Sequence, residues 1–195
     1  DDTGLGLGER IALANERGAD LFLSVHANSM PTTEARSRVH GVETFFLSAD
    51  ASDAAAAEVA RLENADDETA AAPVEQGALG AILADLARSE AHANSAQLAY
   101  LLHDRLVRET EARDRGVRQA PFVVLQGAQM PAVLLEVGYI SHPRESKRLA
   151  DPAEQERIAR AVAAGVDRFR REVLEKQART TLGGKAGAAA LHPAR

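Results

Sequence analysis

The sequence predicts an α/β fold, a mixed twisted sheet flanked by helices. Two short apolar runs, residues 21–25 and 132–137, have the composition of buried strands. Other segments, most clearly residues 95–108, carry apolar side chains at spacings of three and four residues, which is typical of helices that cover a sheet. Strands and amphipathic helices that alternate along one chain indicate the α/β class.

The N-terminal region predicts a helix followed by a strand. Residues 9–17 have loosely helical spacing and end at Gly18, a common C-terminal signal of helices. Residues 21–25 then predict a strand, and His26 begins the polar stretch that follows it. Because open α/β sheets place their sites at the carboxyl ends of strands, His26 lies at a candidate functional position.

A second strand and an insertion follow. Residues 42–47 are rich in β-branched and aromatic side chains, which favours a strand. Residues 48–78 are rich in Ala, Asp and Glu and predict an insertion in the sheet domain. Its helix is expected to begin at Ser52 or Asp53, either of which can act as the N-cap, and to extend through Glu63, with a loop over residues 66–77.

The second half predicts helices that alternate with buried strands. Two amphipathic helices are expected at residues 79–88 and 95–108, and strands at residues 122–125 and 132–137. Pro152 is suited to the first position of a long final helix.

Length and composition indicate one domain over residues 1–176 and a disordered Gly- and Ala-rich tail over residues 177–195. No apolar run is long enough to span a membrane. The net charge of -6, from 23 basic and 29 acidic residues, argues against a nucleic acid partner. Because the chain has no cysteine, any metal must be bound by His, Asp or Glu.

Two residues are candidates for chemistry on their surroundings alone. His26 could be a metal ligand, a general base or an ordinary loop histidine. Glu136 lies in an apolar run, where a buried carboxylate needs a cation, a metal or a raised pKa. Two explanations for Glu136 stay open: a salt bridge to Arg115 or Arg118, or a role in an active site. The other histidines have no companion at metal-ligand spacing and are predicted to lie at the surface.

Five separated stretches resemble the zinc-dependent N-acetylmuramoyl-L-alanine amidases. They are residues 10–15 (RIALAN), 21–28 (LFLSVHAN), 41–46 (GVETFF), 115–120 (RGVRQA) and 131–141 (PAVLLEVGYIS), followed by Glu145 and Leu149. Their order is that of the family, and the resemblance extends over about residues 2–169.

The resemblance implies a peptidoglycan hydrolase that cleaves the amide bond between N-acetylmuramic acid and L-alanine, in cell-wall remodelling and daughter-cell separation. His26 would be a Zn²⁺ ligand and Glu136 the catalytic glutamate, while Asn28 and Arg115 would support the site or the substrate. Such enzymes hold zinc with two His and one Glu. The other two ligands are expected upstream of Asp1, in roughly 50 to 60 residues, so this chain alone is expected to be inactive.

The insertion at residues 48–85 resembles that of Gram-negative cell-division amidases, whose helix covers the active site until a partner protein moves it. Glu63 would then be the inhibitory side chain at the zinc, with Glu58 as the alternative, although either residue could belong to a solvated helix face. The resemblance implies a periplasmic location, peptidoglycan as substrate and an activator protein that binds the insert helix.

A function of another class stays open at this point. If the upstream zinc ligands are absent from the natural protein, the chain would be a non-catalytic module that binds peptidoglycan or a partner protein. A zinc carboxypeptidase fits the ligand chemistry but not the motifs. The coding sequence upstream of Asp1 would discriminate between these functions.

Overall fold

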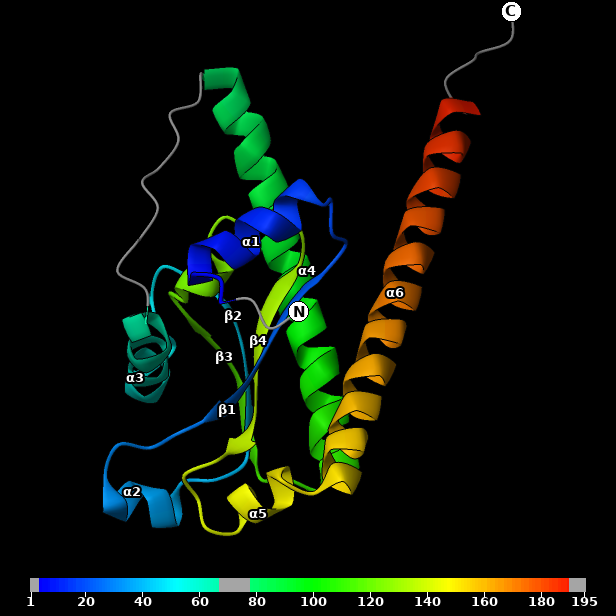
Figure 1. The fold of residues 1–195 in the computed structure, drawn as a ribbon. Helices are drawn as coiled ribbons and strands as arrows, with labels where there is room; N and C mark the ends of the chain where they lie inside the picture. Colours follow the sequence, from blue (N-terminus) through cyan, green and yellow to red (C-terminus); the bar gives the residue numbers. More distant parts are fainter. Residues whose placement is uncertain (1–3, 67–77, 190–195) are drawn as a thin grey trace, which may run out of the picture.

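The computed structural model describes residues 4–66 and 78–189, and its centre is a four-stranded sheet (Figure 1). The strand order is β1 (Phe22–Asn28), β4 (Ala132–Tyr139), β2 (Val42–Leu47), β3 (Asp114–Ala120). β1 is parallel to β4 and β2 is parallel to β3, whereas β2 and β4 are antiparallel. The sheet is therefore mixed, which confirms the predicted fold class.

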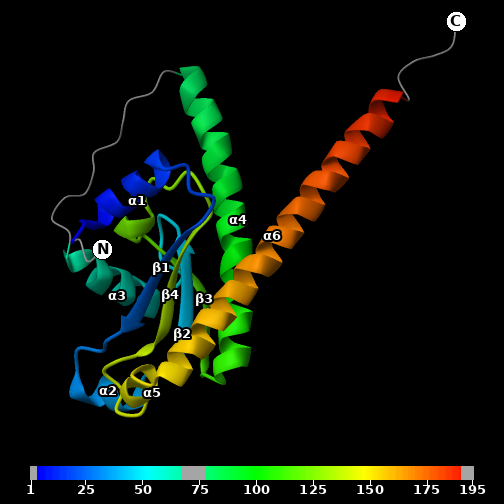
Figure 2. The same ribbon diagram turned by 45° about the vertical axis from the view of Figure 1, so that its right-hand side comes forward.

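Helices cover both faces of the sheet (Figure 2). One face carries α4 (Ala78–Thr110) and α6 (Pro152–Ala189), and the other carries α1 (Leu7–Glu16), α3 (Ala54–Glu63) and the 3-10 turn η2 (Val123–Leu125). The short helices α2 (Thr33–Arg38) and α5 (Glu145–Leu149) lie near one end of the sheet (Figure 1), and the turn η1 (Asn64–Asp66) follows α3. Within the part of the chain that the structure describes, no helix has the length and apolar character that crossing a bilayer requires.

Strand β4 explains how the sheet directs side chains to its two faces. All of its positions are buried, as its apolar sequence predicts. Val133 and Leu135 pack in the core beneath α4 and α6, whereas Leu134 packs in the core beneath α1 and α3. Since side chains alternate along a strand, Glu136 is directed to the same face as Leu134.

The strand predicted at residues 122–125 is wrong. Residues 123–125 form η2, and the strand in this region is β3, immediately before it. The apolar side chains of Phe122, Val124 and Leu125 fill the core beneath α1 and α3, so their composition reflects burial and not strand pairing. β3 was missed because its sequence, DRGVRQA, is mainly polar.

Three further predictions differ from the structure or fall outside it. The helices expected at residues 79–88 and 95–108 form the single helix α4, because the residues between them include no Gly or Pro to break it. α6 continues to Ala189, so the first part of the expected disordered tail is helical. Its many Ala residues favour that conformation. Most of the loop expected at residues 66–77 lies outside the described residues.

Candidate functional site

His26 and Glu136 face each other on neighbouring strands. β1 continues to Asn28, so His26 lies within the strand, whereas the sequence placed it just beyond the strand end. In the parallel pairing of β1 and β4, His26 is in register with Glu136. Two residues that the sequence singled out separately therefore lie side by side on the face that α3 covers.

Glu63, the last residue of α3, completes a cluster with these two residues. Its Oε2 atom lies 2.5 Å from Nδ1 of His26, and both side chains are about one quarter exposed. One possible ligand atom from each of His26, Glu63 and Glu136 lies within 4.8 Å of the other two. The sequence predicted only His26 as a metal ligand within this chain, and the structure brings two carboxylates to it.

The chemistry of this cluster fits a divalent metal such as zinc. Imidazole nitrogen and carboxylate oxygen are both common zinc ligands. Nε2 of His26 lies 2.9 Å from the hydroxyl of Ser24, which leaves Nδ1 as the nitrogen that faces the carboxylates. Both carboxylate oxygens of Glu136 are buried and have no hydrogen-bond partner in the structure. A cation beside them would satisfy these atoms.

Burial raises the pKa of Glu136 well above its ordinary value, and the negative charges of Glu63 and Glu43 raise it further. Glu136 is fully buried, so water cannot stabilise its charged form. A cation in the cluster would oppose this effect and favour the carboxylate. The protonation state of Glu136 therefore depends strongly on what lies beside it, as expected for a general acid–base group.

A second buried carboxylate, Glu43 on β2, lies beside Glu136 in the antiparallel pairing of β2 and β4. Nε of Arg115 and the hydroxyl of Tyr139 both donate to Oε1 of Glu43, the latter at 2.7 Å. Nη1 of Arg118 lies 4.0 Å from Oε2 of Glu43. The alternative in which Arg115 or Arg118 neutralises Glu136 is therefore wrong, because both arginines pair with Glu43.

Sequence reasoning missed Glu43, although a signal for it was present. Glu43 is an acidic residue within the β-branched and aromatic run at residues 42–47, just as Glu136 is an acidic residue within an apolar run. The predicted site residue Arg115 is thus placed through Glu43, and its guanidinium also lies 5.5 Å from the ring centre of Tyr139. Arg115 supports the wall of the site next to Glu136.

Helix α3 is fixed at both ends. Asp53 caps its N-terminus, where its carboxylate accepts from the backbone of Ala56 at 2.8 Å. At the other end, the Asn64 side chain donates to the carbonyl of Pro121 and accepts from the backbone N–H of Val123, both at 2.9 Å. These contacts hold the C-terminal end of α3, and with it the adjacent Glu63, against the sheet domain.

The other predicted site residues lie outside the cluster. Asn28 is buried at the end of β1, where its carbonyl accepts from the backbone of Ile140 at 2.8 Å. Its side-chain Nδ2 has no hydrogen-bond partner in the described part of the chain. Glu58 is bound by Arg61 on the same helix, with a shortest distance of 2.7 Å. Of the two glutamates considered for inhibition, the structure places Glu63 at His26.

Two histidines expected at the surface are buried. Nδ1 of His103 lies 3.1 Å from the hydroxyl of Thr44, and its Nε2 lies 2.8 Å from the carboxylate of Asp114. Nδ1 of His142 accepts from two backbone N–H groups at the start of α5. Both residues are less than one tenth exposed. The prediction failed for His103 because its partners are distant in the sequence, and for His142 because a local contact with the backbone at the start of α5, and not a metal-ligand spacing, satisfies its ring.

Comparison with known proteins gives consistent results. The family described as N-acetylmuramoyl-L-alanine amidase matches residues 1–168. The AmiA amidase of Escherichia coli K12 is 34% identical over 168 residues, which cover 85% of this chain and 57% of AmiA. The AmiC amidase of Neisseria meningitidis is 28% identical, over 87% of this chain and 40% of AmiC. The chain thus spans about half the length of these relatives.

Solved structures show the same fold. The catalytic domain of the amidase CwlV from Paenibacillus polymyxa is 28% identical with a TM-score of 0.56, covering 87% of this chain and 68% of that domain. An N-acetylmuramoyl-L-alanine amidase of Clostridium difficile 630 has a TM-score of 0.60 at 23% identity, over 87% of this chain and 67% of that chain. Because the family match covers most of its length, this chain belongs to the N-acetylmuramoyl-L-alanine amidase family.

Proposed function

We propose that the protein is a zinc-dependent hydrolase that cleaves the amide bond between N-acetylmuramic acid and L-alanine in peptidoglycan. Membership of the amidase family supports the reaction. The observation that carries the proposal is the pairing of His26 with Glu136. It places a zinc-type nitrogen donor beside a buried carboxylate that has no hydrogen-bond partner in the described part of the chain.

In this proposal each residue has a defined task. His26 holds the metal through Nδ1, and Ser24 orients the ring through Nε2. The bound zinc supplies Lewis-acid polarisation and lowers the pKa of water. Glu136 accepts a proton from the attacking water at its carboxylate and passes it to the leaving amine of L-alanine. Arg115 and Glu43 form the neighbouring wall and balance each other's charge.

The arrangement of α3 supports an autoinhibited state. Glu63 occupies the position beside His26 where substrate would approach, and the two groups are in direct contact. The side chain of Asn64, next in sequence, bonds to the backbone on both sides of Phe122 and keeps α3 closed. Activation then requires release of α3, which we assign to an activator protein that binds this helix. Glu58, engaged with Arg61, is not the inhibitory group in this scheme.

The resemblance to cell-division amidases supports a role in daughter-cell separation and a periplasmic location. A precedent for a protein partner is the CwlD amidase of Clostridioides difficile, whose structure was solved in complex with the GerS lipoprotein. That chain is 21% identical, with a TM-score of 0.54 over 84% of this chain and 60% of CwlD, so it supports only the similarity of fold.

The test uses the complete gene product with purified peptidoglycan and counts new amino termini of L-alanine. Glu136→Gln should lower turnover by about 100-fold or more, as loss of a general base does. Glu63→Gln and Asn64→Ala should raise basal turnover, because each weakens the closed state. The control Glu58→Gln should leave basal turnover unchanged.

Two results would contradict the proposal. Wild-type turnover in Glu136→Gln would remove the assigned base, and unchanged turnover in both Glu63→Gln and Asn64→Ala would remove the inhibitory role of α3. The non-catalytic binding module would be favoured if the zinc-loaded protein binds peptidoglycan but releases no L-alanine amino termini. This result would have to hold both for the wild type and for a variant that lacks α3.

A further inference from the structure

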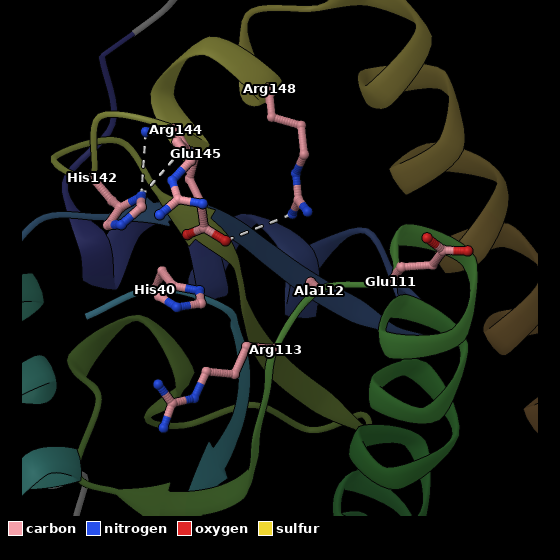
Figure 3. A pocket seen from close by; sticks show the side chains of 8 residues that line it. All are labelled: His40, Glu111, Ala112, Arg113, His142, Arg144, Glu145 and Arg148. Carbon is pink, nitrogen blue, oxygen red and sulfur yellow. Dashed lines mark hydrogen bonds and ion pairs between the residues drawn. The ribbon is translucent and has the colours of Figure 1, made fainter. Parts of the chain in front are cut away.

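A small hollow opens near α5, and none of His26, Glu63 and Glu136 lines it, whereas Glu145 of the amidase resemblance does. Its volume is about 230 Å³. Three segments that are distant in the sequence form it: His40 before β2, residues 111–113 between α4 and β3, and residues 142–148 in and before α5. Figure 3 shows their side chains around the hollow.

The backbone brings these segments into close contact. Gly41 has φ of +115°, and a Cβ atom at this position would lie 2.2 Å from the carbonyl oxygen of Arg113. Only glycine therefore permits this approach. The next residue, Val42, donates its backbone N–H to the same carbonyl at 3.0 Å. His40 and Arg113 are thus held beside each other by rigid backbone contacts.

Within the described residues, carboxylates pair with Arg148 of the lining, which lies 3.7 Å from Glu145 and 3.1 Å from Glu154, but not with Arg113 or Arg144. Both oxygens of Glu145 accept from the backbone N–H of Gly41, at 3.0 and 3.1 Å, and Oε2 also accepts from Tyr139 at 2.8 Å. In Figure 3 the carboxylate of Glu111 is turned away from the histidines. Within the described residues, the guanidinium groups of Arg113 and Arg144 form no ion pair with a carboxylate.

Several hydrogen-bond donors of the lining lack acceptors. Nδ1 of His142 accepts from two backbone N–H groups, so in the neutral ring the proton lies on Nε2, which is then a donor. Nη2 of Arg148 is buried and makes no hydrogen bond within the described residues, although Arg148 forms ion pairs with Glu145 at 3.7 Å and with Glu154 at 3.1 Å. Burial lowers the pKa of His40; the nearby Glu145 carboxylate opposes this shift, and the positive charge of Arg113 adds to it.

We propose that this hollow binds one small oxyanion group, a carboxylate or a phosphate, between Arg113, Arg144 and the histidines. Arg113 and Arg144 come from two different segments of the lining (Figure 3), and an anion in the hollow would be attracted by a guanidinium group from each. A hollow of about 230 Å³ is smaller than the pockets that hold nucleotides or drug-sized molecules. The proposal does not depend on amidase activity.

The experiment is an NMR titration of the isotope-labelled protein with sodium phosphate and, separately, with sodium acetate at constant ionic strength. The wild type should show saturable shifts of the His40 and His142 ring signals and of the Arg113 and Arg144 Nε–H signals. Stronger binding of phosphate would assign the site to phosphate groups. Equal or stronger binding of acetate would assign it to carboxylates, such as those of peptides.

Paired variants separate a built site from general charge attraction. Arg113→Gln with Arg144→Gln should weaken binding at least tenfold, because both side chains are exposed and their loss should not unfold the protein. The matched control, Arg17→Gln with Arg160→Gln, removes the same charge from exposed positions outside the hollow and should bind as the wild type does. Linear, non-saturating shifts in the wild type, or equal weakening in both double variants, would overturn the proposal.

Discussion

Replacing Glu136 by Gln should make the metal-free protein more stable while it removes activity. Glu136 is fully buried, its oxygens lack hydrogen-bond partners among the residues that the structure describes, and burial together with two further carboxylates raises its pKa. A charged group in such a place destabilises the native state. Glutamine has nearly the same shape and cannot ionise, so the variant keeps the packing and loses the unfavourable charge.

The size of the effect depends on pH with a defined sign. The folded pKa of Glu136 lies above the ordinary value of 4.5, so the unfolded chain loses its proton at lower pH than the native protein does. The wild type therefore loses stability as pH rises above 4.5 through the folded pKa, at about 1.4 kcal/mol per pH unit. Below pH 4.5 the two proteins should be nearly equal in stability.

At pH 7 an unpaired buried charge costs more than an unpaired buried amide by about 1–3 kcal/mol. For a chain of this length, each kcal/mol corresponds to about 2–4 °C in Tm. Thermal unfolding in the presence of a chelator, from pH 4 to pH 8, should show a gap between variant and wild type that opens with pH. The control Glu156→Gln, at an exposed ion pair on α6, should follow the wild type.

Zinc provides a second measurement of the same change. A metal that binds the native state raises Tm, and Glu136→Gln removes a negative charge beside the proposed metal position, although Glu136 is assigned as the base and not as the ligand. The rise in Tm on adding zinc should be smaller in the variant than in the wild type. If Glu136→Gln lowers Tm at pH 7 without metal, or if its effect does not vary with pH, the assignment of an unpaired buried carboxylate is wrong.

Four further substitutions test the packing of the domain by urea unfolding. Arg115→Met should cost about 3 kcal/mol, because it removes from the buried Glu43 carboxylate the guanidinium that bonds to it directly and leaves only Arg118 at 4.0 Å; no loss would show that Glu43 is neutral. Gly165→Ala should destabilise by about 1 kcal/mol, because its Cβ would lie 2.7 Å from a leucine of α4. Gly8→Ala, with open space around its Cβ, should stabilise α1 instead. Glu111→Gly should stabilise by up to about 1 kcal/mol, because Glu111 has φ of 52° at the end of α4; a loss would indicate that its side chain has a structural role.

The strands that could be predicted are those in which the apolar side chains that mark burial lie in the same residues that pair in the sheet. β2 has the predicted bounds, and β4 contains the whole predicted run, because β-branched, aromatic and aliphatic side chains fill both faces there. β3 could not be found in this way. Its polar side chains form ion pairs with Glu43 and Asp53, so the reasons for its position lie on other elements. Periodicity along one segment carries no information about such partners.

Prediction of the site was limited in the same manner. The surroundings of His26 and Glu136 in the sequence marked both residues as candidates, because each is a polar residue in or beside an apolar run. The register that places them side by side is a property of the sheet. The contact of Glu63 with His26 joins an inserted helix to an edge strand, and helix periodicity alone gives equal weight to Glu63 and Glu58.

The misread segment at residues 122–125 and the position of Glu63 have a common physical cause. The two hydrogen bonds of the Asn64 side chain end on the backbone of Pro121 and Val123, at the point where β3 gives way to η2. A strand over residues 122–125 would use the Val123 N–H for sheet pairing and would leave the Asn64 carbonyl without it. The turn η2 is therefore what allows the end of α3 to bind the sheet domain, and this attachment holds Glu63 at His26. The failure of a local strand prediction and the closure of the site thus depend on the same pair of hydrogen bonds.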